Sequence, residues 1–129
     1  MATPIIYQDF SLDFSVHPVR KDLVLKSNAD AVVAAIKNLL QTNHYEVPFH
    51  PEIVCNIRKL LVENVSDFTA RDLNRFITET IENFEPRCTI QSLVVTPDED
   101  NNLYNIKMRV FINSSANPLN VDFILRRVR

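Results

Sequence analysis

The fold is decided in residues 78–95, whose sequence is TETIENFEPRCTIQSLVV. Up to Phe84 the apolar side chains recur at steps of three and four residues, which predicts a helix. Pro86 removes a backbone donor and stops that helix. From Thr89 onward the β-branched and aliphatic residues favour a strand. The Glu85-Pro86-Arg87 tripeptide therefore marks the change from helix to sheet.

Three amphipathic helices are predicted up to this point. The first begins at Ser27, and Asp30 three residues later resembles a capping box with Asp in place of Glu. The second begins at Pro51, because a proline at the first helical position loses no hydrogen bond. The third covers Ala70 to Glu85, with Thr69 as its N-cap.

Three strands are predicted after the tripeptide. Residues 89–96 are the first, and residues 103–112 are the second, in which apolar and polar side chains alternate almost throughout. Residues 121–128 form the third. Polar turns separate them, at 97–102 and 113–120. Helices followed by a three-stranded antiparallel meander predict an α+β fold.

The chain is expected to form one domain with an N-terminal extension. A length of 129 residues is close to the common domain size. In residues 1–26 the apolar Phe10, Leu12 and Phe14 alternate with polar neighbours, which predicts a short strand or an extended arm lying along the body. Residues 27–129 are then the single α+β domain.

Composition excludes several classes of function. The chain has no glycine, which rules out the Gly-rich phosphate loops of nucleotide-binding proteins. Its net charge of −2 gives no general attraction to nucleic acid or to an anionic membrane. Two distant cysteines, Cys55 and Cys88, are expected to be buried thiols. We predict no cofactor, no nucleic-acid partner and no membrane partner.

Candidate catalytic groups do not form a convincing site. Glu79, Glu82 and Glu85 follow one another on the third helix, but the first two lie opposite its apolar face, which is typical of a solvated surface. His17, His44 and His50 are too widely spaced for a helical metal pair, and turn or surface positions are the expectation. We therefore predict a protein that is not an enzyme and holds no metal.

Two charged features have more than one interpretation. The Glu85-Pro86-Arg87 tripeptide could fasten the helix–strand corner, or it could offer a partner a rigid arginine. The second feature is basic. It comprises Arg126 and Arg127 at the end of the chain and the neighbouring Lys107 and Arg109, and it could be a polar strand face or a contact with an acidic protein. The residues alone do not decide between these alternatives.

The order of these motifs resembles a known family. Pro48-Phe49-His50-Pro51 followed by a leucine-rich helix, and a later helix ending in Asn83-Phe84-Glu85-Pro86-Arg87 before two strands, is similar to the baseplate wedge and sheath-initiator family of contractile phage tails. That family includes a type VI secretion baseplate subunit and also has a lysozyme-like label. The resemblance extends over residues 13–125. It departs from the family at Cys55, which stands where a glycine is usual.

The resemblance implies a structural role in the virion tail baseplate, for a protein made in the host cytoplasm. Its implied partners are the wedge core proteins and the tail sheath protein, with the tail tube as a further candidate. The free protein would be a monomer, with several copies around the assembled tail. The implied wedge-core contact is Glu85, Pro86 and Arg87. For sheath strands added at a sheet edge, the candidate residues are Lys107, Arg109, Phe111, Phe123, Leu125 and Arg127.

Two other hypotheses remain open at this stage. The lysozyme-like label suggests a peptidoglycan-cleaving enzyme, although the chain has no tryptophan, a common sugar-stacking residue. An unrelated adaptor with the same order of helices and strands is the third hypothesis.

Overall fold

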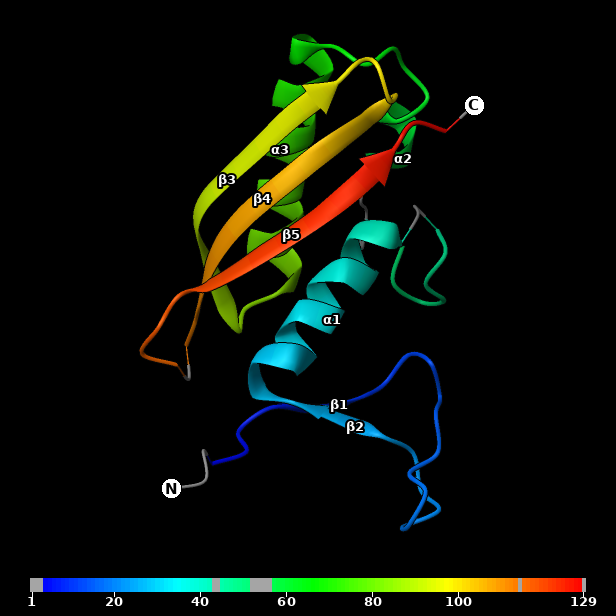
Figure 1. Ribbon diagram of the computed structural model, residues 1–129, viewed down its shortest axis with the longest axis vertical. Coiled ribbons are helices and arrows are strands. Elements are labelled where there is room, and N and C mark those ends of the chain that lie inside the picture. The colour runs from blue at the N-terminus through cyan, green and yellow to red at the C-terminus, as the bar shows by residue number, and fades with distance from the viewer. Residues whose placement is uncertain (1–3, 43–44, 52–56, 114, 129) are drawn as a thin grey trace.

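The computed structural model describes residues 4–42, 45–51, 57–113 and 115–128. The helices are α1 (Asn28–Gln41), α2 (Ile57–Leu60) and α3 (Asp67–Phe84). The strands are β1 (Gln8–Phe10), β2 (Leu25–Ser27), β3 (Cys88–Asp98), β4 (Leu103–Ile112) and β5 (Leu119–Arg126). Mixed helices and an antiparallel sheet confirm the coarse prediction of fold class (Figure 1).

The main sheet is the predicted meander, with strand order β3-β4-β5. Both pairs are antiparallel, and β4 lies in the centre. The alternation predicted for β4 is confirmed, because Tyr104, Ile106, Met108, Val110 and Ile112 are all buried. Their side chains face the helices, and Figure 1 shows α3 crossing behind the sheet. The opposite face of the sheet has no helix over it in that view.

The core forms where the helices meet this row of β4 side chains. Ile36 from α1 and Leu73, Ile77 and Ile81 from α3 are fully buried. Burying an aliphatic side chain of this size contributes roughly 1.5–3 kcal/mol. The apolar residues predicted at steps of three and four along α3 are thus the ones buried between this helix and the sheet.

The N-terminal segment is not a simple extended arm. Residues 4–27 fold back so that β1 pairs antiparallel with β2, forming a separate two-stranded sheet beside α1. The alternation of apolar residues does not face the core, because Phe10, Leu12 and Phe14 are exposed and Ser11 is buried. The short strand predicted here is present as β1, but the extended arm is not confirmed, because the segment folds back to pair its backbone with β2.

Helix starts also differ from the prediction. Ser27 is the N-cap of α1, but its side chain makes no capping hydrogen bond, so the capping box with Asp30 is wrong. Instead the Oδ1 atom of Asn28 accepts the Ile6 N–H at 2.9 Å, which ties the helix start to the N-terminal segment. The N-cap of α3 is Ser66 rather than Thr69, and its Oγ accepts the Thr69 N–H at 3.2 Å.

The second predicted helix is described only from residue 57. Residues 52–56, including Cys55, lie outside the described part of the chain, and after Leu60 the backbone turns. The third strand begins and ends two residues earlier than predicted, at Leu119 and Arg126. Within the described ranges, no helix combines the length and apolarity needed to cross a bilayer.

Candidate functional site

The Glu85-Pro86-Arg87 tripeptide forms a corner that is fastened by its own charges. Glu85 ends α3 as its C-cap and is 5% exposed. Arg87 donates from Nε to Glu85 Oε1 at 2.7 Å and from Nη2 to Glu85 Oε2 at 2.9 Å. This two-pronged geometry is the strong form of an arginine–carboxylate pair. The corner interpretation of the tripeptide therefore has direct geometric support.

The third nitrogen of Arg87 links the corner to the N-terminal sheet. Its Nη1 donates to Asp9 Oδ2 on β1 at 3.0 Å, and its guanidinium carbon lies 5.6 Å from the centre of the Tyr7 ring. The hydrogen bond with Glu85 raises the pKa of Arg87, burial opposes this rise, and the hydrogen bond with Asp9 adds to it. Every guanidinium nitrogen thus has an internal acceptor.

The corner is also joined to the end of the central strand. Asn113 donates from its backbone N–H to Arg87 O and from its side chain to Pro86 O, both at 3.0 Å. Cys88 follows as a buried free thiol, and burial raises its pKa to about 11. Of the predicted contact residues, Pro86 is exposed, Arg87 is partly exposed and Glu85 is enclosed. The partner-accessible part of the corner is therefore the Pro86 ring and one side of Arg87.

The β5 edge of the sheet has free backbone groups. In an antiparallel ladder, successive residues point their N–H and C=O alternately toward one neighbour and away from it. The Arg127 N–H donates to Asn102 O at 3.0 Å, toward β4. By alternation, Leu125 and Phe123 also bond to β4, whereas Arg126 and Ile124 point outward. Across the described residues, no hydrogen bond is found for the outward groups of Ile124 and Arg126, whereas just beyond the strand Val128 donates its N–H to Leu61 O at 2.9 Å.

The β3 edge is protected in three ways. Asn74 of α3 donates from Nδ2 to Leu93 O at 2.9 Å, so this outward carbonyl already has a donor. Pro97 lies four residues after Leu93 on β3 and also faces outward, but a proline has no backbone N–H. The register shifts between Ile90 and Ser92, which places a bulge at Gln91. Prolines, bulges and covering side chains are the usual means of preventing strand addition.

The predicted sheath-contact residues divide between two strands. Lys107, Arg109 and Phe111 lie on β4, whose backbone pairs with both neighbours. An added strand cannot bond to them, so a partner contact there is limited to side chains. Phe123 and Leu125 lie on the β5 edge, and Arg127 follows it directly. The sequence left open which strand forms the edge, and since β4 is the central strand, only the candidates on and after β5 lie at an edge of the sheet.

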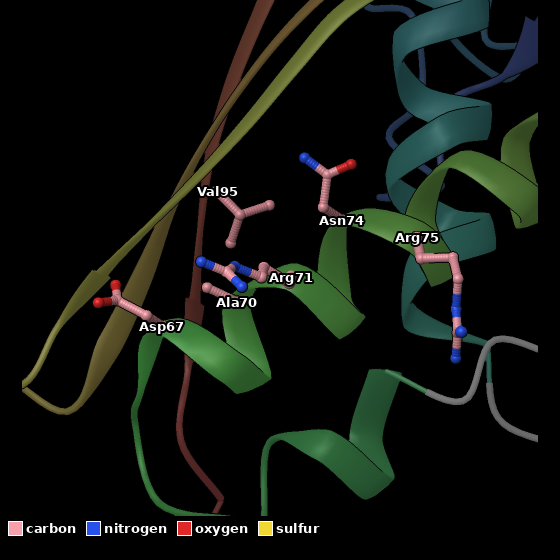
Figure 2. Close-up of a pocket in the computed structure, with 6 residues that line it drawn as sticks. All are labelled: Asp67, Ala70, Arg71, Asn74, Arg75 and Val95. Carbon is pink, nitrogen blue, oxygen red and sulfur yellow. The ribbon is translucent and has the colours of Figure 1, made fainter.

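A polar groove runs between the start of α3 and β3, with a volume of about 610 Å³. Figure 2 shows Arg71 reaching from α3 toward the strand near Val95, while Arg75 turns away. Asp67 is the carboxylate among the residues that line it. Glycoside hydrolysis needs two carboxylates around the scissile bond, and this groove does not supply them.

The glutamates of α3 likewise do not converge. Glu79 and Glu82 are exposed, as predicted for a solvated face. Both Glu85 oxygens are engaged by Arg87, so this carboxylate is not free to act as an acid or a nucleophile. His17 accepts the backbone N–H of Val19 and Arg20, which confirms a turn histidine. His44 lies outside the described residues. Within the described ranges, no three metal-binding side chains gather.

Sequence reasoning missed Asn74. Asparagine is a poor residue for a helix interior, and this one directly follows the buried Leu73. A polar residue that disfavours a helix and stands next to a core position often has a side-chain partner. This was the indication that the sequence offered for Asn74. The sequence could not say that this partner is the outward carbonyl of a strand.

Comparison with known proteins places the chain in a family. The sequence model described as "Baseplate wedge protein gp25" matches residues 26–117. Baseplate wedge protein gp25 of Enterobacteria phage T4 is 25% identical over 104 residues, which are 81% of this chain and 77% of that protein. The family-model match spans α1, α2, α3, β3 and β4 and ends before β5 begins.

Two solved structures share the fold. A crystal structure from Geobacter sulfurreducens, described as a candidate tail lysozyme, has a TM-score of 0.73 at 20% identity and covers 82% of this chain and 96% of that one. A chain of the anti-feeding prophage baseplate has a TM-score of 0.65 at 15% identity and covers 95% and 87%. At these identities the likeness concerns the fold alone. With the family match, the chain belongs to the baseplate wedge protein gp25 family of contractile phage tails and related injection systems.

Proposed function

We propose that this chain is a structural subunit that docks on the wedge core proteins and starts the tail sheath by accepting a strand at the β5 edge. As a family member it is a baseplate wedge protein of a phage tail or a related contractile system. The observation that carries the proposal is the difference between the two edges of the main sheet. β3 is protected by Asn74, Pro97 and a bulge, whereas the outward backbone groups of Ile124 and Arg126 on β5 have no partner among the described residues.

Strand addition fits the side chains of β5. Phe123 and Leu125 are only partly buried on the helix-facing side, so an added strand with apolar side chains would complete their burial. Ile124 is 57% exposed on the opposite face. Backbone bonds would provide affinity, and the alternating side chains would provide selectivity. A sheath arm that adds here would extend the sheet from three strands to four.

A matched pair of proline variants tests this proposal. The N–H of Ile124 on β5 and the N–H of Val95 on β3 both point outward, so a proline at either position removes no bond within the sheet. Ile124→Pro should abolish recruitment of sheath protein to reconstituted baseplates, scored by electron microscopy. Val95→Pro should recruit normally, with circular dichroism confirming that both variants fold. Normal recruitment by Ile124→Pro would refute strand addition at β5.

Docking on the wedge core is proposed for the exposed side of the corner. Pro86 is exposed between two anchored residues, so its ring is held rigidly at low entropic cost to a partner. Pro86→Ala should fold but should lose most of its incorporation into baseplates, measured by quantitative co-sedimentation. Glu82→Ala, at an exposed position one turn earlier on α3, is the control. Equal incorporation of the two variants would place the docking site elsewhere.

A further inference from the structure

A hollow lies beside the β5 edge, between that strand and α1. It has a volume of about 470 Å³. Its lining comprises Lys37 from α1, then Asp122, Phe123 and Ile124 from β5, and Asn105, Ile106 and Lys107 from β4. Figure 1 shows α1 passing next to β5. Because the hollow borders the edge with free backbone groups, a strand added to β5 would lie along it.

Lys37 is the cation that α1 contributes to this hollow. It is exposed and follows the fully buried Ile36, so its stem starts at the margin of the core. No ion pair with Lys37 is found in the described part of the chain. Asp122 lines the same hollow, but it lies directly opposite Lys107 in the β4–β5 register. Lys107 lines the hollow as well, so the lining has two lysines and one carboxylate and keeps one unmatched positive charge.

A strand that adds to an edge needs a feature that sets its register. Backbone bonds repeat every two residues, so a slip by two residues keeps each side chain on the same face. The apolar Phe123 and Leu125 accept many apolar neighbours and discriminate weakly between such slips. A single charge beside this row discriminates well, because the wrong register leaves the charge without its partner or opposite a like charge.

We propose that Lys37 sets the register of the strand added at β5, by pairing with a carboxylate on the helix-facing side of that strand. This inference rests on the proposed strand addition. The occupant is an extended segment of the sheath protein in which apolar residues alternate with polar ones, and one helix-facing position is Asp or Glu. Charge complementarity with Lys37 and the free backbone of the β5 edge together define this chemistry.

The test uses overlapping 12-residue peptides from both ends of the sheath protein of the same tail, with binding to the full chain followed by fluorescence anisotropy. The peptide that binds best should contain a carboxylate in an alternating apolar sequence. Lys37→Glu should weaken its binding roughly fivefold to tenfold, the range expected for a partly exposed ion pair that becomes a repulsion. Replacing the peptide carboxylate by lysine should restore binding to the Lys37→Glu variant.

Two controls separate the possible failures. Lys59→Glu makes the same change of charge on α2, away from the hollow, and should bind like the unmodified chain. If Lys37→Glu also binds like the unmodified chain while Ile124→Pro does not bind, the register role is overturned and strand addition stands. If Ile124→Pro binds the peptide as well as the unmodified chain does, strand addition at β5 itself is overturned.

Discussion

The Glu85–Arg87 corner and the β5 edge treat their polar groups in opposite ways. At the corner, both oxygens of Glu85 and every nitrogen of the Arg87 guanidinium have internal partners. Along β5, the outward N–H and C=O groups of Ile124 and Arg126 have none among the described residues. Saturated groups hold a fold together, and unsaturated ones remain available to another chain. From this difference we expect the corner to contribute mainly to stability and the edge to be the site of the proposed recruitment.

The largest expected effect is at the corner. Arg87→Ala would leave the enclosed Glu85 carboxylate without its cation, and breaking a buried pair in this way costs about 3–5 kcal/mol. Urea unfolding followed by circular dichroism would measure this loss. If Arg87 were only an exposed contact residue, its removal would leave the free energy of unfolding almost unchanged.

Asp9→Asn is the matched control for that variant. It removes only the outer carboxylate, whose side chain is 44% exposed, and should cost at most about 1 kcal/mol. If Arg87→Ala were as mild as Asp9→Asn, the corner would not be a stabilising element. In that case the wedge-core contact alone would explain the tripeptide.

A smaller effect is expected at the β3 edge. Asn74→Leu removes the donor to Leu93 O, and the loss of one such hydrogen bond costs about 0.5–1.5 kcal/mol. Combined with Pro97→Val, it would also expose the outward groups of β3. We expect this double variant to self-associate in sedimentation experiments at concentrations where the unmodified chain does not. A double variant that sediments like the unmodified chain would contradict the protective role of Asn74 and Pro97.

Local patterns predicted the parts of the fold that local physics determines. The apolar spacing of α3, the stop at Pro86 and the alternation in β4 all depend on neighbours within a few residues, and each is confirmed. The missing glycines were also informative, because left-handed backbone falls on other residues, among them Asn28 and Asn102.

Long-range pairing accounts for what the sequence did not predict. Strand order makes β4 central, so Lys107 and Arg109 cannot bond to an added strand even though their alternation is regular. The Arg87–Asp9 bond joins residues 78 positions apart, and no spacing rule indicates it. For the same reason the N-terminal segment, read locally as an extended arm, is a strand pair fastened to the corner.

The most direct test is residue-resolved amide hydrogen exchange on β5, with and without sheath protein. In the free chain the N–H groups of Ile124 and Arg126 should exchange quickly, whereas those of Phe123 and Leu125, bonded to β4, should exchange slowly. On sheath binding, Ile124 and Arg126 should become protected, while Val95 on β3 should not change. Protection that appears at Val95 and not at Ile124 would contradict the account.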